Sequence, residues 1–148
     1  MCSQEKSSVH TPCIRSGQHA DVPAVAALET AVFSDAWSRE DIASHAEASH
    51  LVFLVATLGE QVVGYLLGSH IPPEGEIYRV AVHPDYRRRG LGRLLCDAFL
   101  ARTEQCYLEV RRSNISARAL YESLGFIFSG ERKNYYKNPT EDACLYRR

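Results

Sequence analysis

An arginine-rich segment with two glycines is the part of this sequence whose residue types point most directly to chemistry. It reads HPDYRRRGLGRLL, from His83 to Leu95, and it follows a run of β-branched residues. A glycine-rich turn at the start of a helix directs free backbone N–H groups and the positive end of the helix dipole to one point. Gly90 and Gly92 would let an anion approach the backbone, and the arginines would add positive charge. The segment therefore predicts an anion-binding turn.

The known nucleotide loops do not fit this turn. No Gly-Lys-Ser or Gly-Lys-Thr follows, as in a P-loop, and Leu95 stands where the dinucleotide fingerprint has its third glycine. The formal net charge is -1, from 17 basic and 18 acidic residues, so the whole molecule does not attract a polyanion such as nucleic acid. On spacing alone, an ordinary helix start with solvated arginines stays open.

Four stretches together resemble the GNAT acetyltransferases, and most closely the RimI-type enzymes that acetylate the N-terminal alanine of a small-subunit ribosomal protein. The resemblance extends from about Ile14 to Arg148, with the second and third stretches the most specific as a pair. The stretches are FSDAWS from Phe33, VAVHPDYRRRGLGR from Val80, LEVRRSNISARALYESLGF from Leu108 and RKNYYKNPTEDACLY from Arg132.

The resemblance implies acetyl-CoA as the co-substrate, with its pyrophosphate on the anion-binding turn. Strand residues before the turn would hold the pantetheine arm, and Asn114 would hydrogen-bond the cofactor. The cofactor-binding residues expected by this likeness are Val80, Ala81, Val82, Arg88, Arg89, Gly90, Leu91, Gly92, Arg93 and Asn114.

Glu109 and Tyr121 match the general base and general acid of the family. Acetyl transfer needs a neutral amine, which a peptide α-amine with a pKa of about 7.7 to 8.0 supplies more readily than a lysine. Glu109 would take the proton, directly or through a water, and Tyr121 would give one to the leaving thiolate. On the residues alone, Glu109 could instead pair with Arg111, and Tyr121 could be a packed helix residue.

Aromatic residues at two places are expected to hold the acceptor. Phe33 and Trp37 would line one wall, and Tyr135 and Tyr136 of the last hairpin would line the other. The resemblance implies a protein N-terminus as acceptor, here that of a small-subunit ribosomal protein. These aromatics could also serve only to pack the loops.

A cysteine nucleophile and a metal centre are both disfavoured. The five cysteines form no Cys-x-x-Cys pair, and an odd number cannot all pair within one chain. Cys96 and Cys106 fall in apolar patterns without a local histidine, and no His/Cys grouping has metal-ligand spacing. We therefore expect direct transfer in a ternary complex without a metal.

Hydrophobic periodicity predicts a mixed α/β layout with helices packed on a sheet. The resemblance implies the GNAT fold, an α/β (α+β) fold with a mixed central sheet of about seven strands and helices on both faces. A helix should begin near Asp21, which can cap it, and a short one after the Ser38 to Asp41 capping pattern. A hairpin should turn at Leu58 to Gln61. Ile77, Arg79 and Ala81 should share one strand face. The remaining expectations are a helix from Gly90 to about Glu104, a buried strand CYLEV, a helix ended by Gly125, and two closing strands.

The chain is expected to be one GNAT domain over residues 13–148, after a flexible tail over residues 1–12. The tail lacks the apolar core of a signal peptide, and no run approaches the ~18 apolar residues of a membrane span. We expect a cytoplasmic protein, monomeric or weakly dimeric, that binds neither membrane nor nucleic acid directly. The alternatives are a GNAT enzyme for a lysine side chain or small amine, and a non-catalytic acetyl-CoA-binding subunit.

Overall fold

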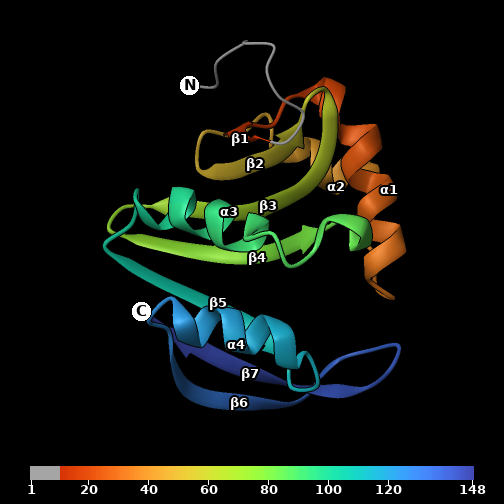
Figure 1. Ribbon diagram of the computed structural model, residues 1–148. Coiled ribbons are helices and arrows are strands. Elements are labelled where there is room, and N and C mark those ends of the chain that lie inside the picture. The colour runs from red at the N-terminus through yellow and green to blue at the C-terminus, as the bar shows by residue number, and fades with distance from the viewer. Residues whose placement is uncertain (1–10) are drawn as a thin grey trace.

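A mixed sheet forms the centre of the molecule (Figure 1). The computed structural model describes residues 11–148, and among them the strand order is β1-β2-β3-β4-β5-β7-β6. All neighbouring strands are antiparallel except β4 and β5, which are parallel. The strands are β1 (Pro12–Ser16), β2 (Leu51–Leu58), β3 (Gln61–Ile71), β4 (Glu74–Val82), β5 (Gln105–Arg111), β6 (Ile127–Tyr136) and β7 (Glu141–Arg147). The expected fold class is confirmed.

Helices cover both faces of this sheet. Helices α3 and α4 supply side chains to the apolar cluster on one face, and α1 and α2 supply them to the cluster on the other. The helices are α1 (Val22–Val32), α2 (Arg39–Ser44), α3 (Leu91–Leu100) and α4 (Ile115–Ser123), with 3-10 turns η1 (His19–Asp21) and η2 (Pro84–Tyr86). The two faces are built by alternation along strands such as β2, where Leu54 faces α3 and Val55 faces α1.

A β-bulge in β4 breaks the expected alternation of that strand. Leu67 of β3 pairs with Arg79 and Gly68 pairs with Ile77, so Tyr78 is an extra residue on β4. Ile77 therefore packs toward α3, whereas Ala81 packs toward α1. The prediction that Ile77 and Ala81 share a face is wrong, because a bulge shifts the two-residue period by one position.

The parallel strands β4 and β5 separate partway along their length. They pair from Glu74 with Gln105 to Ile77 with Leu108, and the pairing stops there. Beyond that point β4 remains paired with β3 up to Val82, while β5 remains paired with β7 up to Arg111. The second halves of β4 and β5 thus border an opening inside the sheet.

Local signals place most element ends correctly. Asp21 is the N-cap residue of α1, and Ser38 accepts a hydrogen bond from the Asp41 N–H at 3.1 Å at the start of α2. The hairpin at residues 58–61 is present, and Gly125 ends α4 with φ of 95°. Such a positive φ favours glycine because it has no Cβ.

Three expectations about local structure need correction. The side chain of Asp21 does not cap α1, because it binds Arg15 and the Gln18 N–H instead. Helix α3 ends at Leu100 rather than Glu104, since the N–H groups of Glu104 and Gln105 bind the Pro73 carbonyl where β5 begins. Strand β5 is buried on one face only. The expected tail over residues 1–12 lies almost wholly outside the described residues, and β1 already includes Pro12.

Candidate active site

A cavity of about 990 Å³ occupies the opening between β4 and β5. Its wall includes the end of β4, the turn before α3, the end of β5, the start of α4, and residues after α1. It therefore brings together segments that are distant in the sequence. The separation of β4 from β5 leaves this space, and residues of α3, α4 and the end of α1 line it.

The turn between β4 and α3 has the geometry of an anion-binding site. Arg88 and Gly90 have positive φ values of 66° and 79°. Gly90 is the N-cap residue of α3, and its carbonyl accepts the N–H of Leu94 at 3.0 Å. The N–H groups of the first turn, before Leu94, are therefore available to a ligand. A Cβ on Gly90 would meet no atom within 4 Å, so the backbone angle is the reason for glycine there.

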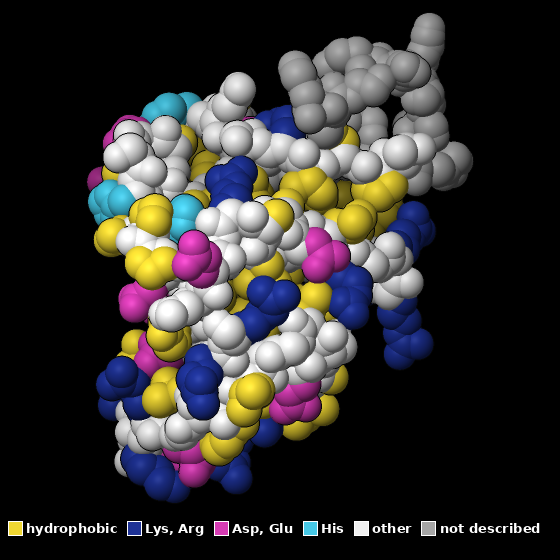
Figure 2. Space-filling model, turned by 90° about the vertical axis from the view of Figure 1, so that its left-hand side faces the viewer, with side chains coloured by type: hydrophobic (Ala, Val, Ile, Leu, Met, Phe, Trp, Pro, Cys, Tyr) yellow, Lys and Arg dark blue, Asp and Glu magenta, His cyan; other side chains and the backbone are white. Residues whose placement is uncertain are grey.

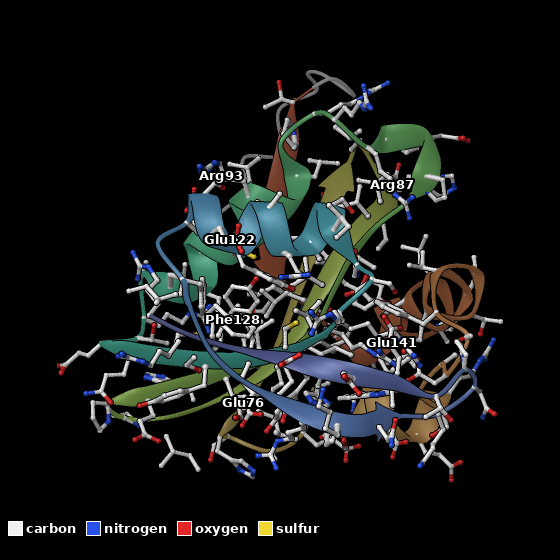
Figure 3. All side chains as sticks on the ribbon, turned by 90° about the horizontal axis from the view of Figure 1, so that it is seen from below. Glu76, Arg87, Arg93, Glu122, Phe128 and Glu141 are labelled. Atoms are coloured by element: carbon white, nitrogen blue, oxygen red, sulfur yellow. The ribbon has the colours of Figure 1, made fainter. Side chains whose placement is uncertain are left out.

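Nine of the ten expected cofactor residues line the cavity, and Arg89 does not. Its guanidinium lies 5.1 Å from the centre of the Tyr86 ring. Arg87, outside the expected set, also lines the cavity and donates from Nε to the Val82 carbonyl at 3.2 Å. Figure 3 shows Arg87 on the segment before α3 and Arg93 beside α4, where Arg93 is 3.5 Å from the Ser123 hydroxyl.

Asn114 begins helix α4 at the edge of the same cavity. Its side-chain oxygen accepts the Ala117 N–H at 3.2 Å and lies 3.4 Å from the Ser116 hydroxyl. The capping role fixes the orientation of the amide. The side-chain NH₂ is then the group with donors to offer a ligand.

Glu109 projects from β5 on the face that is opposite to α4. Strand alternation places Leu108 and Val110 in the core beneath α3 and α4, so Glu109 faces the other way. Its side chain is 23% exposed, and its Oε2 lies 2.6 Å from Nε of Arg132. Arg111, considered as its partner from the sequence, instead binds Asp35 and Glu141.

Tyr121 approaches the cavity from α4, on the other side of β5. The residue is 6% exposed, and its ring meets that of Phe126 edge-on with centroids 5.7 Å apart. Burial raises the pKa of the Tyr121 phenol well above its ordinary value. The phenol therefore stays protonated at neutral pH. The structure thus places Glu109 and Tyr121 on one cavity, reached from opposite faces of β5.

Two of the four expected acceptor residues line the cavity, and Trp37 and Tyr135 do not. Phe33 and Tyr136 line the cavity. Trp37 does not; its ring packs against His45 and Tyr78, at centroid distances of 5.5 and 6.0 Å. Tyr135 is 47% exposed and meets the ring of Tyr136 edge-on at 5.1 Å. Burial, followed by a hydrogen bond with Glu109, raises the pKa of Tyr135, so this phenol adjoins the candidate base.

A network of buried charges lies beside the cavity and was not predicted from the sequence. Glu29 is fully buried in α1, where its Oε2 lies 3.0 Å from Nε of Arg79 and its Oε1 accepts a hydrogen bond from Tyr65. Arg79 also binds Asp35. The available signal was position: Glu29 follows Val25 by four residues, so it lies on the apolar stripe of α1. A charge at such a position requires a buried partner.

The described free cysteines are poor nucleophiles. Cys96, Cys106 and Cys144 are all buried. Burial raises the pKa of the Cys96 and Cys106 thiols to about 12, so very little thiolate exists at neutral pH. Neither cysteine is among the residues that line the cavity.

The described residues hold no grouping of three or more His, Cys, Asp or Glu side chains suited to a metal ion. Over residues 11–148, no helix has the length and apolar character needed to cross a membrane. On the face shown in Figure 2, basic and acidic side chains are interspersed rather than gathered in one extended basic patch.

Comparison with known proteins identifies the family. The model of the acetyltransferase (GNAT) family matches residues 22–126. This chain belongs to the GNAT acetyltransferase family. The matched segment contains the anion-binding turn, Glu109 and Tyr121. The expected enzyme class is thereby confirmed, and the family uses acetyl-CoA.

Among the family members, the chain is similar to enzymes of the RimI type. It is 36% identical over 134 residues to the [Ribosomal protein bS18]-alanine N-acetyltransferase of Escherichia coli strain K12, covering 87% of this chain and 88% of that protein. It is 37% identical to N-alpha-acetyltransferase RimI of Mycobacterium tuberculosis, covering 87% of each. The crystal structure of the E. coli enzyme superimposes with a TM-score of 0.85 and 31% identity, covering 93% of this chain and 92% of that one.

Proposed function

We propose that this GNAT enzyme transfers an acetyl group from acetyl-CoA to the N-terminal α-amine of a protein, and that an N-terminal alanine of a small-subunit ribosomal protein is its acceptor. The observation that supports this most is one cavity with an anion-binding turn at one side and Glu109 and Tyr121 at the strand opening. The similarity to alanine N-acetyltransferases supports the choice of acceptor.

The cavity offers the hydrogen-bond donors and positive charge that acetyl-CoA requires. The backbone N–H groups after Gly90, with Arg88 and Arg93 beside them, supply donors and positive charge for a pyrophosphate. Strand β4 beyond Ile77 lacks a β5 partner, so the edge of residues 80–82 that faces away from β3 can bind an extended amide chain. On this segment the Val82 carbonyl already accepts a hydrogen bond from Nε of Arg87. Arg89 would contribute through its charge alone. When bound, acetyl-CoA supplies a thioester that an amine can attack.

Glu109 acts on the acceptor amine in this proposal. The α-amine must lose a proton as its nitrogen forms the new bond to the acetyl carbon, and the Glu109 carboxylate receives that proton directly or through a water. The side chain is partly exposed on the face away from α4, which leaves an approach for the acceptor. Arg132 and Tyr135 hold the carboxylate in place.

Tyr121 acts on the departing sulfur. As the bond between carbon and sulfur breaks, the phenol donates a hydrogen bond to the sulfur and stabilises the charge that develops there. Burial holds the pKa of this phenol above that of a free thiol, which is about 8.5, so complete transfer of its proton to a thiolate is uphill. The thiolate therefore leaves hydrogen-bonded to Tyr121 and takes its proton from water, while Glu109 returns to water the proton that it received from the amine.

The acceptor enters between Phe33 and Tyr136, on the side where Glu109 is exposed. Thiol release from acetyl-CoA tests the proposal with two versions of one Ala-initiated peptide, one with a free α-amine and one with that amine blocked. We expect release with the free peptide only. Equal release with a blocked peptide that retains a lysine would contradict an α-amine acceptor.

A further inference from the structure

Two arginines, Arg79 and Arg111, flank the opening between β4 and β5 and are not part of the proposed catalytic pair. Beyond Ile77 and Leu108, no backbone pairing holds the two strands together. Arg79 follows this point on β4, and Arg111 follows it on β5. The bulge at Tyr78 turns Arg79 toward the α1 face, which strand alternation makes the face of Arg111 as well.

Asp35, in the segment between α1 and α2, bridges these two arginines. Its Oδ1 lies 3.1 Å from Nη2 of Arg79, and its Oδ2 lies 3.5 Å from Nη2 of Arg111. Nη2 of Arg79 also donates to the Asp35 carbonyl at 2.8 Å. We propose that Asp35 is a positioning residue for the acceptor. Its carboxylate spans the separated strands and holds the two walls of the acceptor site, residues 33–37 and residues 137–139, in a fixed position relative to each other.

Each arginine has a carboxylate of its own besides the shared one. Glu29 lies 3.0 Å from Arg79, and Glu141 lies 3.2 Å from Arg111. The arginine side chains are only 10% and 17% exposed. Without Asp35 each arginine would still have an acidic partner, so the fold can persist. What would be lost is the carboxylate bridge between Arg79 on β4 and Arg111 on β5.

The same cluster ties together the two segments that border the acceptor entrance. Arg111 donates to the carbonyls of Lys137 and Pro139 at 2.8 and 2.9 Å, in the loop between β6 and β7. The Ser34 hydroxyl donates to the Asn138 carbonyl at 2.7 Å. Asp35 thus connects residues 33–37 with residues 137–139 through Arg111. We therefore expect the order of each segment to depend on the other.

The electrostatics of Asp35 agree with a charged bridge. Burial opposes the charged form, but the attraction and hydrogen bonding of Arg79, with help from Arg111, keep the pKa of Asp35 below its ordinary value. The carboxylate is therefore ionised throughout the neutral range. The carboxylate therefore keeps its charge near physiological pH, and the bridge does not act as a pH switch.

This inference rests on the proposed function for its consequence, because the walls matter only if an acceptor enters between them. Its structural part can be measured without any acceptor. Asp35→Asn keeps the size of the side chain and removes its charge. Glu40→Gln removes one charge from an exposed position in α2 and serves as the matched control.

Hydrogen exchange followed by mass spectrometry is the first measurement. In Asp35→Asn we expect amide exchange to become about tenfold faster in residues 33–37 and in residues 137–139 together, since one charged hydrogen bond is worth about that factor or more. Glu40→Gln should leave both segments unchanged. Faster exchange in only one segment, or in neither, would overturn the proposal.

Steady-state kinetics with an Ala-initiated peptide is the second measurement. Asp35→Asn should raise the KM for the peptide about tenfold, with the KM for acetyl-CoA within about twofold of the wild type. A similar rise in both KM values, or a loss of acetyl-CoA binding, would show a general structural defect and would overturn a positioning role. If the wild type does not acetylate the peptide at all, the proposed function fails, and the exchange experiment still decides on the bridge.

Discussion

At the scale of single residues, the candidate catalytic pair differs in how firmly each side chain is held. Tyr121 is packed against Phe126 and nearly fully buried, whereas Glu109 is partly exposed and held by Arg132. A buried phenol keeps its proton, and a partly exposed carboxylate remains open to an incoming amine. The environments therefore suit Tyr121 to donate a hydrogen bond and Glu109 to accept a proton.

Removal of either function should slow the chemical step. We expect Glu109→Gln and Tyr121→Phe to lower kcat by about 10²-fold or more, because a positioned base contributes about 10² to 10⁴ and a hydrogen-bond donor to developing charge contributes about 10² to 10³. Acetyl-CoA binding should change little, since neither substitution alters the anion-binding turn. Stopped assays of thiol release with a saturating peptide measure this.

Matched controls separate chemistry from general damage. Glu60→Gln changes an exposed turn residue between β2 and β3, and Tyr107→Phe changes an exposed tyrosine on β5. Both should keep wild-type kcat. Wild-type rates in Glu109→Gln or Tyr121→Phe would remove the role that we assign to that residue.

The arginines of the turn offer a further comparison at this scale. Arg88 lines the cavity, whereas Arg89 lies against Tyr86. Arg88→Ala should weaken acetyl-CoA binding about tenfold, as expected for the loss of a charged hydrogen bond, and Arg89→Ala should weaken it by less than about threefold. Titration calorimetry with acetyl-CoA gives both values. The reverse order would contradict the orientation of this turn.

At the scale of elements, a charged contact joins β1 to the start of α1. Nη1 and Nη2 of Arg15 donate to the Asp21 carboxylate, at 2.8 and 2.9 Å, and the Gln18 N–H donates to it at 2.8 Å. The hydrogen bond from Arg15, aided by that from Gln18, outweighs burial and keeps the pKa of Asp21 below its ordinary value. The carboxylate therefore stabilises the junction only while it is ionised.

This contact predicts a pH-dependent stability. A carboxyl group whose pKa is lower in the folded state contributes stability above its unfolded pKa of about 3.9, and that contribution is lost as pH falls through the folded pKa. Asp21→Asn should reduce the free energy of unfolding at pH 7 by about 1 to 3 kcal/mol. The difference from the wild type should shrink below about pH 4.

Urea unfolding at a series of pH values measures this difference. Asp97→Asn, at an exposed position of α3, is the control and should match the wild type at every pH. A difference for Asp21→Asn that stays constant down to pH 3 would show that charge is not its source.

Element types were largely predictable from the sequence because local signals determine them. The Ser38 cap, the positive φ at Gly125 and the turn at residues 58–61 each follow from short-range chemistry. The bulge at Tyr78 was not predictable, since it results from pairing between β3 and β4. The early end of α3 has a similar cause, because Pro73 from another part of the chain captures the following N–H groups.

At the scale of the whole molecule, the sheet works as two parts joined where β4 and β5 pair. The part from β1 to β4 carries the anion-binding turn, and the part from β5 to β7 carries Glu109. The cavity forms where the parts separate, and Asp35 spans them on the α1 face. The cofactor side of the site could be predicted because its residues are nearly contiguous in the sequence. The partners within the charged network could not be predicted, because its members meet only in the folded chain. These members are Glu29, Arg79, Asp35 and Arg111.

The central claim, that acetyl-CoA is used to acetylate a protein α-amine, is tested most directly by locating the acetyl group. The purified enzyme is incubated with acetyl-CoA and an Ala-initiated peptide that also contains an internal lysine, and fragment-ion mass spectrometry assigns the modified nitrogen. We predict acetylation of the α-amine, with the lysine unmodified. Acetylation of the lysine ε-amine alone would contradict this account.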